Sequence, residues 1–167
     1  TLLFTENVDE FVPQTLMTYQ EKSFCNVSTD DLGLQSEDEK KAAEAEAEEK
    51  KGFLTFVKDS LGDQVKEVRL NKNLGAYPVA MVPDAGMSFE MEKYMKRVNP
   101  DFSFPSARIL ELNPDNDTVK HLQEVMTSDP VMAKDLAKLL CCQAQLMAQL
   151  PIDDPYAYTD LVCKLVK

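Results

Sequence analysis

Few side chains in this sequence could support nucleophilic or metal chemistry. The 167 residues contain four cysteines and one histidine: Cys25, Cys141, Cys142, Cys163 and His121. No two cysteines have the spacing of a CxxC motif, and one histidine cannot complete the usual zinc ligand sets. Free cysteines that serve as small apolar side chains are typical of a reducing compartment. We therefore predict no metal site and a cytoplasmic location.

Carboxylates are plentiful but are concentrated where acid–base catalysis is implausible. The sequence has 29 Asp and Glu residues, and the densest run, EDEKKAAEAEAEEKK, spans residues 37–51. This run favours a helix and is nearly all polar, so it is interpreted as a solvated connector; an acidic recruitment segment is the alternative. The sequence lacks GxSxG, HExxH and a glycine-rich phosphate loop. We predict no catalytic residues, no cofactor site and no enzyme activity, unless the fold assembles an unexpected titratable cluster.

The composition indicates a globular protein and argues against nucleic-acid binding. Hydrophobic residues make up 44% of the chain and charged residues 28%. The net charge is −11, and residues 1–51, with thirteen acidic and five basic side chains, carry −8 of it. A nucleic-acid-binding face needs the opposite sign. No run reaches membrane-spanning length, so we expect no membrane partner. Because the first residue is Thr1, we expect a fragment of a longer chain.

Hydrophobic periodicity predicts an α+β fold. A βαβ unit is expected over the first 28 residues, with strands at Leu2–Phe4 and Ser23–Val27 around a helix at Asn7–Tyr19 in which Pro13 fits only the first turn. A capping box of Ser36 and Glu39 then opens the connector helix, which continues to Leu61. Three strands and one further helix follow, at residues 65–70, 78–82, 107–112 and 118–127.

The last 37 residues are predicted to form two helices. The apolar surface of these helices is too large for the pair to bury by itself, so the rest of the chain or a second copy must cover part of it. Their break lies between Pro151 and Pro155, and Asp154 is the expected N-cap of the second helix. A ridge of small residues runs beside the apolar stripe of the first helix, and only a narrow line of polar residues, including Gln145, remains. Both helices are ordinary core, or they pair with a second copy in a four-helix bundle. Leu150 and Val166 extend the two apolar faces, and nine positions would form the contact with a second copy: Met132, Leu136, Leu139, Leu140, Met147, Tyr158, Leu161, Val162 and Leu165.

A second amphipathic helix, at residues 87–98, has a face rich in methionine. Its apolar positions are Met87, Met91, Tyr94, Met95 and Val98, while its polar face includes Glu92, Lys93 and Lys96. A methionine stripe is flexible and polarizable, which suits a surface that binds many partners. Ordinary core packing is the alternative.

The order of these motifs resembles that of the ninety-kilodalton heat-shock protein chaperones, of the HtpG type. The resemblance covers the whole chain and depends on LLFTENVDEF, SFCNVS, LGDQVKEVRLNKNL, PVAMVPDAGMSFEMEKYM, ILELNPDN and DDPYAYTDLVCKLV. It implies that residues 1–36 are the end of the middle domain plus a linker. Residues 37–167 correspond to the C-terminal dimerisation domain, in which 37–61 form the connector helix.

The resemblance also assigns roles to the two amphipathic regions. It implies that the last two helices form a four-helix bundle in a homodimer, through the nine positions given above, and that Met87, Met91, Tyr94 and Met95 contact unfolded client proteins. It places the ATP and magnesium site of this stress-response chaperone outside the chain. The chain ends CKLVK rather than Met-Glu-Glu-Val-Asp, so docking of tail-binding co-chaperones is not expected. The alternative function is a structural dimerisation scaffold that touches no client.

Overall fold

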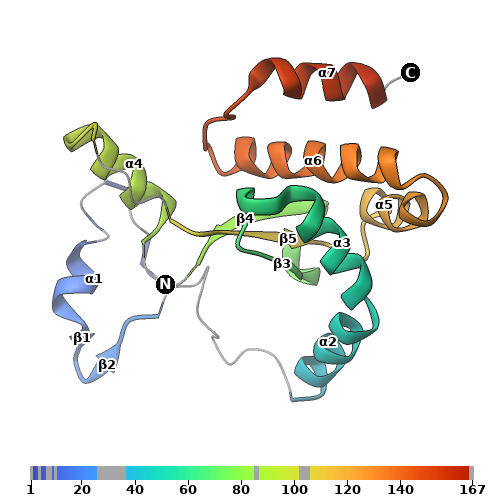
Figure 1. Ribbon diagram of the computed structural model, residues 1–167. Helices are drawn as coiled ribbons and strands as arrows, with labels where there is room; N and C mark the ends of the chain where they lie inside the picture. Colours follow the sequence, from blue (N-terminus) through green and yellow to red (C-terminus); the bar gives the residue numbers. More distant parts are fainter. Residues whose placement is uncertain are drawn as a thin grey trace. The chain divides into compact units, whose positions relative to one another are not determined.

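The computed structural model describes residues 2–3, 5–6, 9, 11–25, 37–84, 87–101 and 106–165 (Figure 1). The chain divides into two compact units, one made of residues 1–35 and 83–106, the other of residues 36–82 and 107–167. Seven α-helices and two small sheets lie in the described residues. The predicted α+β class is therefore confirmed.

The larger unit is built on the three-stranded sheet that the sequence predicted. Its strands are β3 (Glu67–Leu70), β4 (Val79–Pro83) and β5 (Arg108–Leu112), in the order β3-β5-β4. β3 and β5 run parallel, with Glu67 opposite Ile109 and Leu70 opposite Leu112. β5 lies between the other two strands and is buried from Ile109 onward. Because a central strand of this kind is covered on both faces, its side chains are expected to be mostly apolar, as they are in β5.

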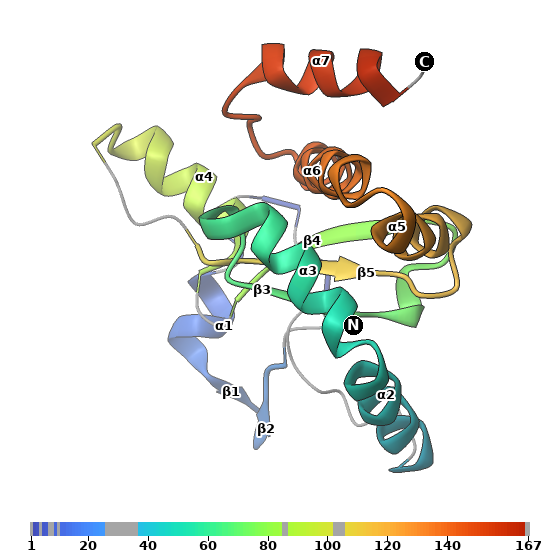
Figure 2. The same ribbon diagram turned by 45° about the vertical axis from the view of Figure 1, so that its right-hand side comes forward.

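Helices α5 (Asp117–Ser128) and α6 (Pro130–Met147) complete the core of this unit. Asn116 caps α5 by accepting a hydrogen bond from the Thr118 amide. α6 packs against α5 and against α3 (Lys51–Leu61). The last helix, α7 (Pro155–Leu165), packs along α6, which lies between α7 and the sheet in both views (Figures 1 and 2). The largest fully buried side chains are Val57, Val65, Val79, Leu110, Leu112, Val119, Leu122, Leu140 and Cys141.

The predicted connector helix is two helices. α2 (Glu37–Glu49) is separated from α3 by one residue, Lys50. α3 buries Phe53, Val57 and Leu61, whereas the described side chains of α2 are exposed or half-buried, as expected for the charged run. α3 ends at Gly62, whose φ of +56° places it in the left-handed region that favours glycine. Ser36 of the predicted capping box lies outside the described residues.

The smaller unit differs from the predicted βαβ arrangement. α1 (Phe11–Leu16) has Pro13 within its first turn, where no backbone donor is lost, while Asn7, the predicted start of this helix, lies outside the described residues. β1 (Thr18–Tyr19) and β2 (Lys22–Ser23) follow as an antiparallel hairpin rather than as one strand after the helix. Gln20 and Glu21, between them, both have positive φ, the conformation of a two-residue turn that matches strand twist. Leu2 and Leu3 are exposed and not in a strand, and Phe4, Asn26 and Val27 lie outside the described residues.

The methionine-rich helix is α4 (Phe89–Val98), which also belongs to the smaller unit. Ser88 caps it by accepting a hydrogen bond from the Met91 amide at 3.0 Å. Glu90 and Glu92 lie in its first turn, and Lys96 and Arg97 in its last, an order that complements the helix dipole. The helix that the sequence predicted at residues 87–98 is thus present, with its start two residues later.

Candidate interaction surfaces

α6 has two apolar faces, and only one of them is covered by the chain itself. Four of the five members of the ridge of small residues, Ala133, Ala137, Cys141 and Ala144, are buried, as are Leu136 and Leu140, whereas the fifth, Ala148, is half-buried. Small side chains at four-residue steps allow neighbouring helices to approach closely. On the remaining surface Met132 is 37% exposed and Met147 is 47% exposed. A helix with apolar residues on nearly all sides is typical of one that is covered on all sides.

α7 contributes no fully buried residue, although it is amphipathic. All of its residues are described, and each is either exposed or half-buried. Asp154 caps its start by accepting hydrogen bonds from the amides of Tyr156 and Ala157 at 3.0 and 2.9 Å, and Pro155 occupies the first helical position. Lys164 forms an ion pair with Asp135 of α6. The helix is therefore well specified locally, while its apolar face remains incompletely covered.

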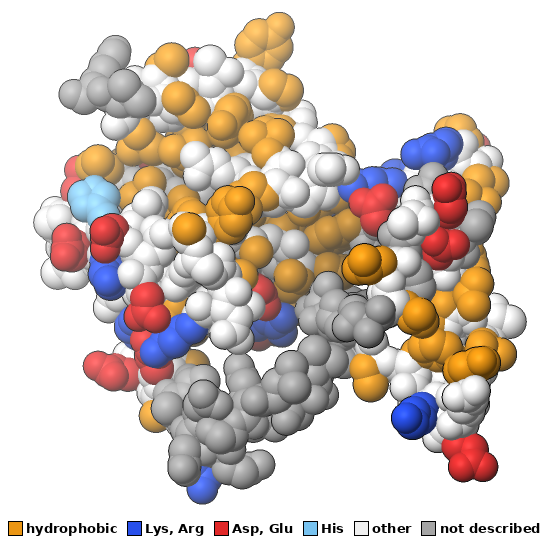
Figure 3. Space-filling model, turned by 180° about the vertical axis from the view of Figure 1, so that it is seen from behind, with side chains coloured by type: hydrophobic (Ala, Val, Ile, Leu, Met, Phe, Trp, Pro, Cys, Tyr) orange, Lys and Arg blue, Asp and Glu red, His pale blue; other side chains and the backbone are white. Residues whose placement is uncertain are grey.

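The nine positions predicted for a dimer interface fall into three groups. Leu136 and Leu140 are buried in the core of the larger unit. Leu139 is half-buried, as are four residues of α7: Tyr158, Leu161, Val162 and Leu165. Met132 and Met147 are exposed, and so are Val131 and Leu146, which the prediction did not include. In Figure 3 hydrophobic side chains gather over the upper part of the molecule, where α6 and α7 lie. The interface assignment itself stays a prediction.

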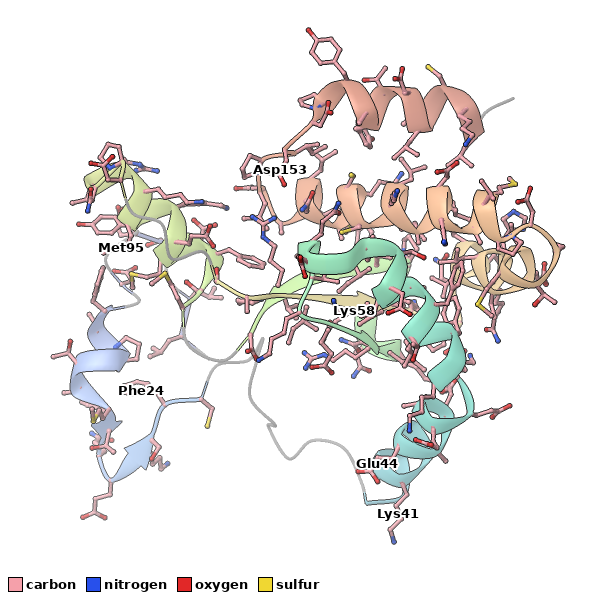
Figure 4. All side chains as sticks on the ribbon, viewed as in Figure 1. Phe24, Lys41, Glu44, Lys58, Met95 and Asp153 are labelled. Atoms are coloured by element: carbon pink, nitrogen blue, oxygen red, sulfur yellow. The ribbon has the colours of Figure 1, made fainter. Side chains whose placement is uncertain are left out.

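The four predicted client positions, three of which lie on α4, differ in exposure. Met87, Tyr94 and Met95 are half-buried, whereas Met91 is only 6% exposed. Val98, at the end of the same stripe, is exposed. Figure 4 shows Met95 on the side of α4 that faces α1. The structure thus places Met91, Tyr94, Met95 and Val98 on one helix, with Met91 covered, whereas Met87 lies two residues before that helix begins.

A neighbouring apolar surface on α1 was not predicted as a site. Phe11, Val12, Leu16, Met17 and Tyr19 are all exposed, although their side chains are large and apolar. Phe11, Val12, Thr15 and Leu16 line an open depression of about 430 Å³. The Phe11 ring packs edge to face on Tyr94, with centroids 5.7 Å apart. Exposed apolar residues grouped in this way are typical of a protein-binding surface.

Glu92 departs most clearly from the predicted polar face of α4. Its side chain is buried, with the residue 2% exposed. Its Oε2 atom accepts hydrogen bonds from the Ser106 amide at 3.0 Å and from the Ser106 hydroxyl at 2.5 Å, and its Oε1 atom accepts one from Lys96 Nζ at 2.8 Å. Burial by itself raises the pKa of Glu92, but the bonds from Lys96 and Ser106 outweigh it and hold that pKa below its usual value. The carboxylate is therefore retained as a charged group inside the unit.

The ELNPDN motif, residues 111–116, begins with a second buried carboxylate, that of Glu111. Glu111 of β5 accepts hydrogen bonds from Arg69 Nε at 2.9 Å, Arg69 Nη2 at 2.6 Å and Asn71 Nδ2 at 2.7 Å. Asn113 donates from Nδ2 to the carbonyls of Gly75 and Tyr77, at 3.0 and 3.2 Å. These bonds join β5 to β3 and to the loop before β4. Since the side chains of Glu111 and Asn113 both join chain segments, we assign these two residues of the motif a structural role.

The cysteines and the histidine form no reactive cluster in the described part of the chain. Burial raises the pKa of the Cys141 thiol to about 12, and burial, together with the nearby Asp153, also raises the pKa of Cys142 (Figure 4). Cys25, Cys163 and His121 are exposed. Among the described residues no group of His, Cys, Asp and Glu could hold a metal ion, and none of the described helices is both long and apolar enough to cross a bilayer. The two apolar surfaces are therefore the candidate sites.

Comparison with known proteins identifies relatives along the entire chain. Residues 1–167 match the family described as Hsp90 protein. "Chaperone protein HtpG" of Bacillus subtilis is 35% identical over 165 residues, which are 99% of this chain and 26% of that protein. The proteins of the same name from Clostridium perfringens and Oceanobacillus iheyensis are each 37% identical, again over 99% of this chain and 26% of the relative. The chain thus spans about a quarter of the length of these relatives.

Proposed function

The chain belongs to the Hsp90 protein family, and on that basis we propose that it is the homodimerisation and client-contact module of an ATP-dependent molecular chaperone. In this proposal residues 1–36 are the end of a middle domain with its linker, and residues 37–167 are a C-terminal dimerisation domain. The relatives are about four times as long as this chain, and we place the ATP site in the part of the protein that precedes it. The work of this region is then to join two ATPase arms and to hold an unfolded protein in the cytoplasm.

The observation that carries the dimerisation proposal is the half-covered face of α7. Tyr158, Leu161, Val162 and Leu165 are each only half-buried against α6. A second α6–α7 pair related by a two-fold axis would cover these residues and the exposed methionines of α6, giving a four-helix bundle. Full burial of a Leu-sized side chain contributes about 1.5–3 kcal/mol. A micromolar dimer requires about 8.2 kcal/mol in total, so a set of this size is sufficient.

Dimerisation gives the rest of such a chaperone a kinetic advantage. Two ATPase arms on one dimer meet at an effective concentration set by their connection rather than by the amount of protein in solution. No residue of this module needs to take part in ATP hydrolysis for that effect. The absence of a reactive cluster among the described residues is compatible with such a role.

The client-contact proposal is supported by the surfaces of α4 and α1. Met87, Tyr94 and Met95 present flexible or aromatic side chains that are half-exposed, and the Phe11 pair continues the apolar surface onto α1. An unfolded protein exposes apolar segments of many shapes, and methionine can repack to fit them. The charged residues of α4 would supply the polar rim of such a contact.

A purely structural dimerisation scaffold is the second candidate, and the burial of Met91 and Glu92 favours it. Both residues are almost fully covered, so part of α4 belongs to the core of the smaller unit. In this alternative the methionine stripe is packing and touches no client. The two candidates share the dimer and differ only in the role of α4.

Sedimentation equilibrium of the 167-residue chain tests the shared part of the proposal. A dimer at tens of micromolar is the expected result. A monomer at that concentration would contradict dimerisation through α6 and α7. Binding of a permanently unfolded protein, reduced and carboxymethylated α-lactalbumin, then separates the two candidates, because only a client-contact module retains it.

A further inference from the structure

Glu92 occupies the same face of α4 as the middle of the methionine stripe. Ser88, Met91, Glu92 and Met95 are spaced three and four residues apart, which places them along one side of the helix. Met91 and Glu92 are the two most deeply buried residues of α4. Whatever holds the Glu92 carboxylate inward therefore also keeps Met91 inward.

The carboxylate of Glu92 is held by two partners from different parts of the chain. Lys96 lies one turn further along α4, while Ser106 lies 14 residues away in the sequence. Ser106 is 9% exposed and donates both its amide and its hydroxyl to the same oxygen. A charged group this deeply buried is stable only while such partners are present, because each bond to a charged group offsets part of the loss of water.

We propose that Glu92, Ser106 and Lys96 form a clasp that controls how much of the methionine stripe is presented: closed, it covers Met91, and released, it allows α4 to turn and expose Met91. This inference depends on the client-contact function proposed above and concerns the regulation of that surface. With the clasp closed, the stripe offers Met87, Tyr94 and Met95 at partial exposure. With the clasp open, Glu92 regains water and Met91, beside it, becomes available to an apolar segment.

A neighbouring ion pair on α4 shows how the clasp differs from an ordinary surface ion pair. Glu90 and Lys93 form an ion pair of 2.7 Å, yet the Glu90 side chain is 57% exposed. Removal of Lys93 leaves Glu90 in water, so no helix movement is needed. Removal of Lys96 or of the Ser106 hydroxyl leaves a buried carboxylate short of partners. Only the removal of Lys96 or of the Ser106 hydroxyl therefore provides a driving force for opening.

The rate at which dilute hydrogen peroxide oxidises each methionine measures opening directly, and mass spectrometry resolves the individual residues. Met81, a buried residue of β4, reports on the core of the larger unit and serves as the internal reference. In a Lys96→Met/Ser106→Ala variant we expect Met91 to be oxidised about tenfold faster relative to Met81, equivalent to about 1.4 kcal/mol. The matched Lys93→Met variant is expected to leave the ratio unchanged.

Two results would overturn the clasp. One is an unchanged Met91 rate in the double variant. The other is an increase at Met91 that is accompanied by faster amide hydrogen exchange throughout α1 and α4, which would mean that Glu92 supports the whole smaller unit; the milder Ser106→Ala variant repeats the measurement with most of the bonds intact.

The binding of reduced, carboxymethylated α-lactalbumin to the same variants separates the clasp from the proposed client function. Faster Met91 oxidation with several-fold tighter binding supports both. Faster oxidation with no binding by any variant leaves the clasp in place and removes the client function. Client binding without faster Met91 oxidation would leave the client function in place and rule out the clasp.

Discussion

Phe11 of α1 and Tyr94 of α4 pack edge to face, with their ring centroids 5.7 Å apart and their planes at 74°. The two residues are 83 positions apart in the chain, yet both belong to the smaller unit. Tyr94 is one of the positions that the resemblance assigned to client contact, and Phe11 lines the adjacent apolar depression. The pair therefore makes the α4 stripe and the α1 patch one continuous apolar surface.

Replacing Phe11 with alanine is expected to loosen α4 and to weaken client binding together. An edge-to-face aromatic pair contributes about 0.5–1.5 kcal/mol beyond its buried area. Amide hydrogen exchange in α4 should therefore become several-fold faster, and the affinity for an unfolded protein should fall. Tyr19→Ala is the control, because Tyr19 is an equally large aromatic residue of the same unit that is 60% exposed. Unchanged exchange in Phe11→Ala would show that the ring contact does not hold α4.

The Leu161→Glu/Leu165→Glu variant is expected to be a folded monomer. Both leucines are half-buried on the face of α7 that we assign to the dimer, and a carboxylate in an apolar interface loses its hydration. We expect the dimer to weaken at least about a hundredfold, equivalent to about 2.8 kcal/mol. The measurement is sedimentation equilibrium, with circular dichroism to check the fold.

Thr159→Glu/Cys163→Glu is the matched control for that variant. It adds the same two charges at the same four-residue spacing, at positions that are exposed and point away from the apolar face. It should remain dimeric. Dissociation of both variants would indicate a general charge effect, and dissociation of neither would remove α7 from the interface.

Met91→Ser and Met95→Ser are expected to act in different ways. Met91 is buried, so its truncation should lower the free energy of unfolding by about 2–5 kcal/mol whether or not it touches clients. Met95 is half-buried, and its replacement should cost less while reducing the suppression of client aggregation. Urea denaturation and light scattering measure the two effects. If Met95→Ser destabilises the protein as strongly as Met91→Ser and its aggregation activity is unchanged at equal folded fraction, α4 is a scaffold element.

The sequence predicts best those elements whose signals are local. The caps at Asn116 and Asp154 follow from residue type at a helix start, and the strands follow from apolar runs bounded by turn residues. Pro13 lies in the first turn of α1, the only part of that helix in which the sequence allows a proline. The hairpin after α1 was missed because its turn is formed by Gln20 and Glu21, residues that rarely adopt positive φ.

The buried polar residues could not be predicted, because their partners are distant in the chain. Glu92 and Lys96 have the four-residue spacing of an exposed helical ion pair, which is how the pattern was interpreted. The decisive partner is Ser106, and nothing in a helical pattern indicates that it returns to α4. Gln145 was likewise assigned to a polar line but is buried in α6. A sequence pattern shows which residues are polar, but whether a polar residue is buried depends on which chain segments pack against it in the folded protein.

The ion pair between Glu46 of α2 and Lys72 predicts a pH dependence of stability. Their side chains approach to 2.8 Å, and the hydrogen bond from Lys72 lowers the pKa of Glu46 below its usual value of 4.5 despite partial burial. Since the folded state then binds this proton less readily than the unfolded state, the pair stabilises the fold above pH 4.5, and that contribution is lost as the pH falls through the lowered pKa. Lys72→Met should therefore lower the melting temperature at pH 7 and have little effect near pH 3. Lys51→Met, which removes the exposed pair with Glu48 on the same part of the chain, should change the melting temperature less at pH 7. An equal loss for Lys72→Met at both pH values would show that the lysine acts through packing and not through the charge of Glu46.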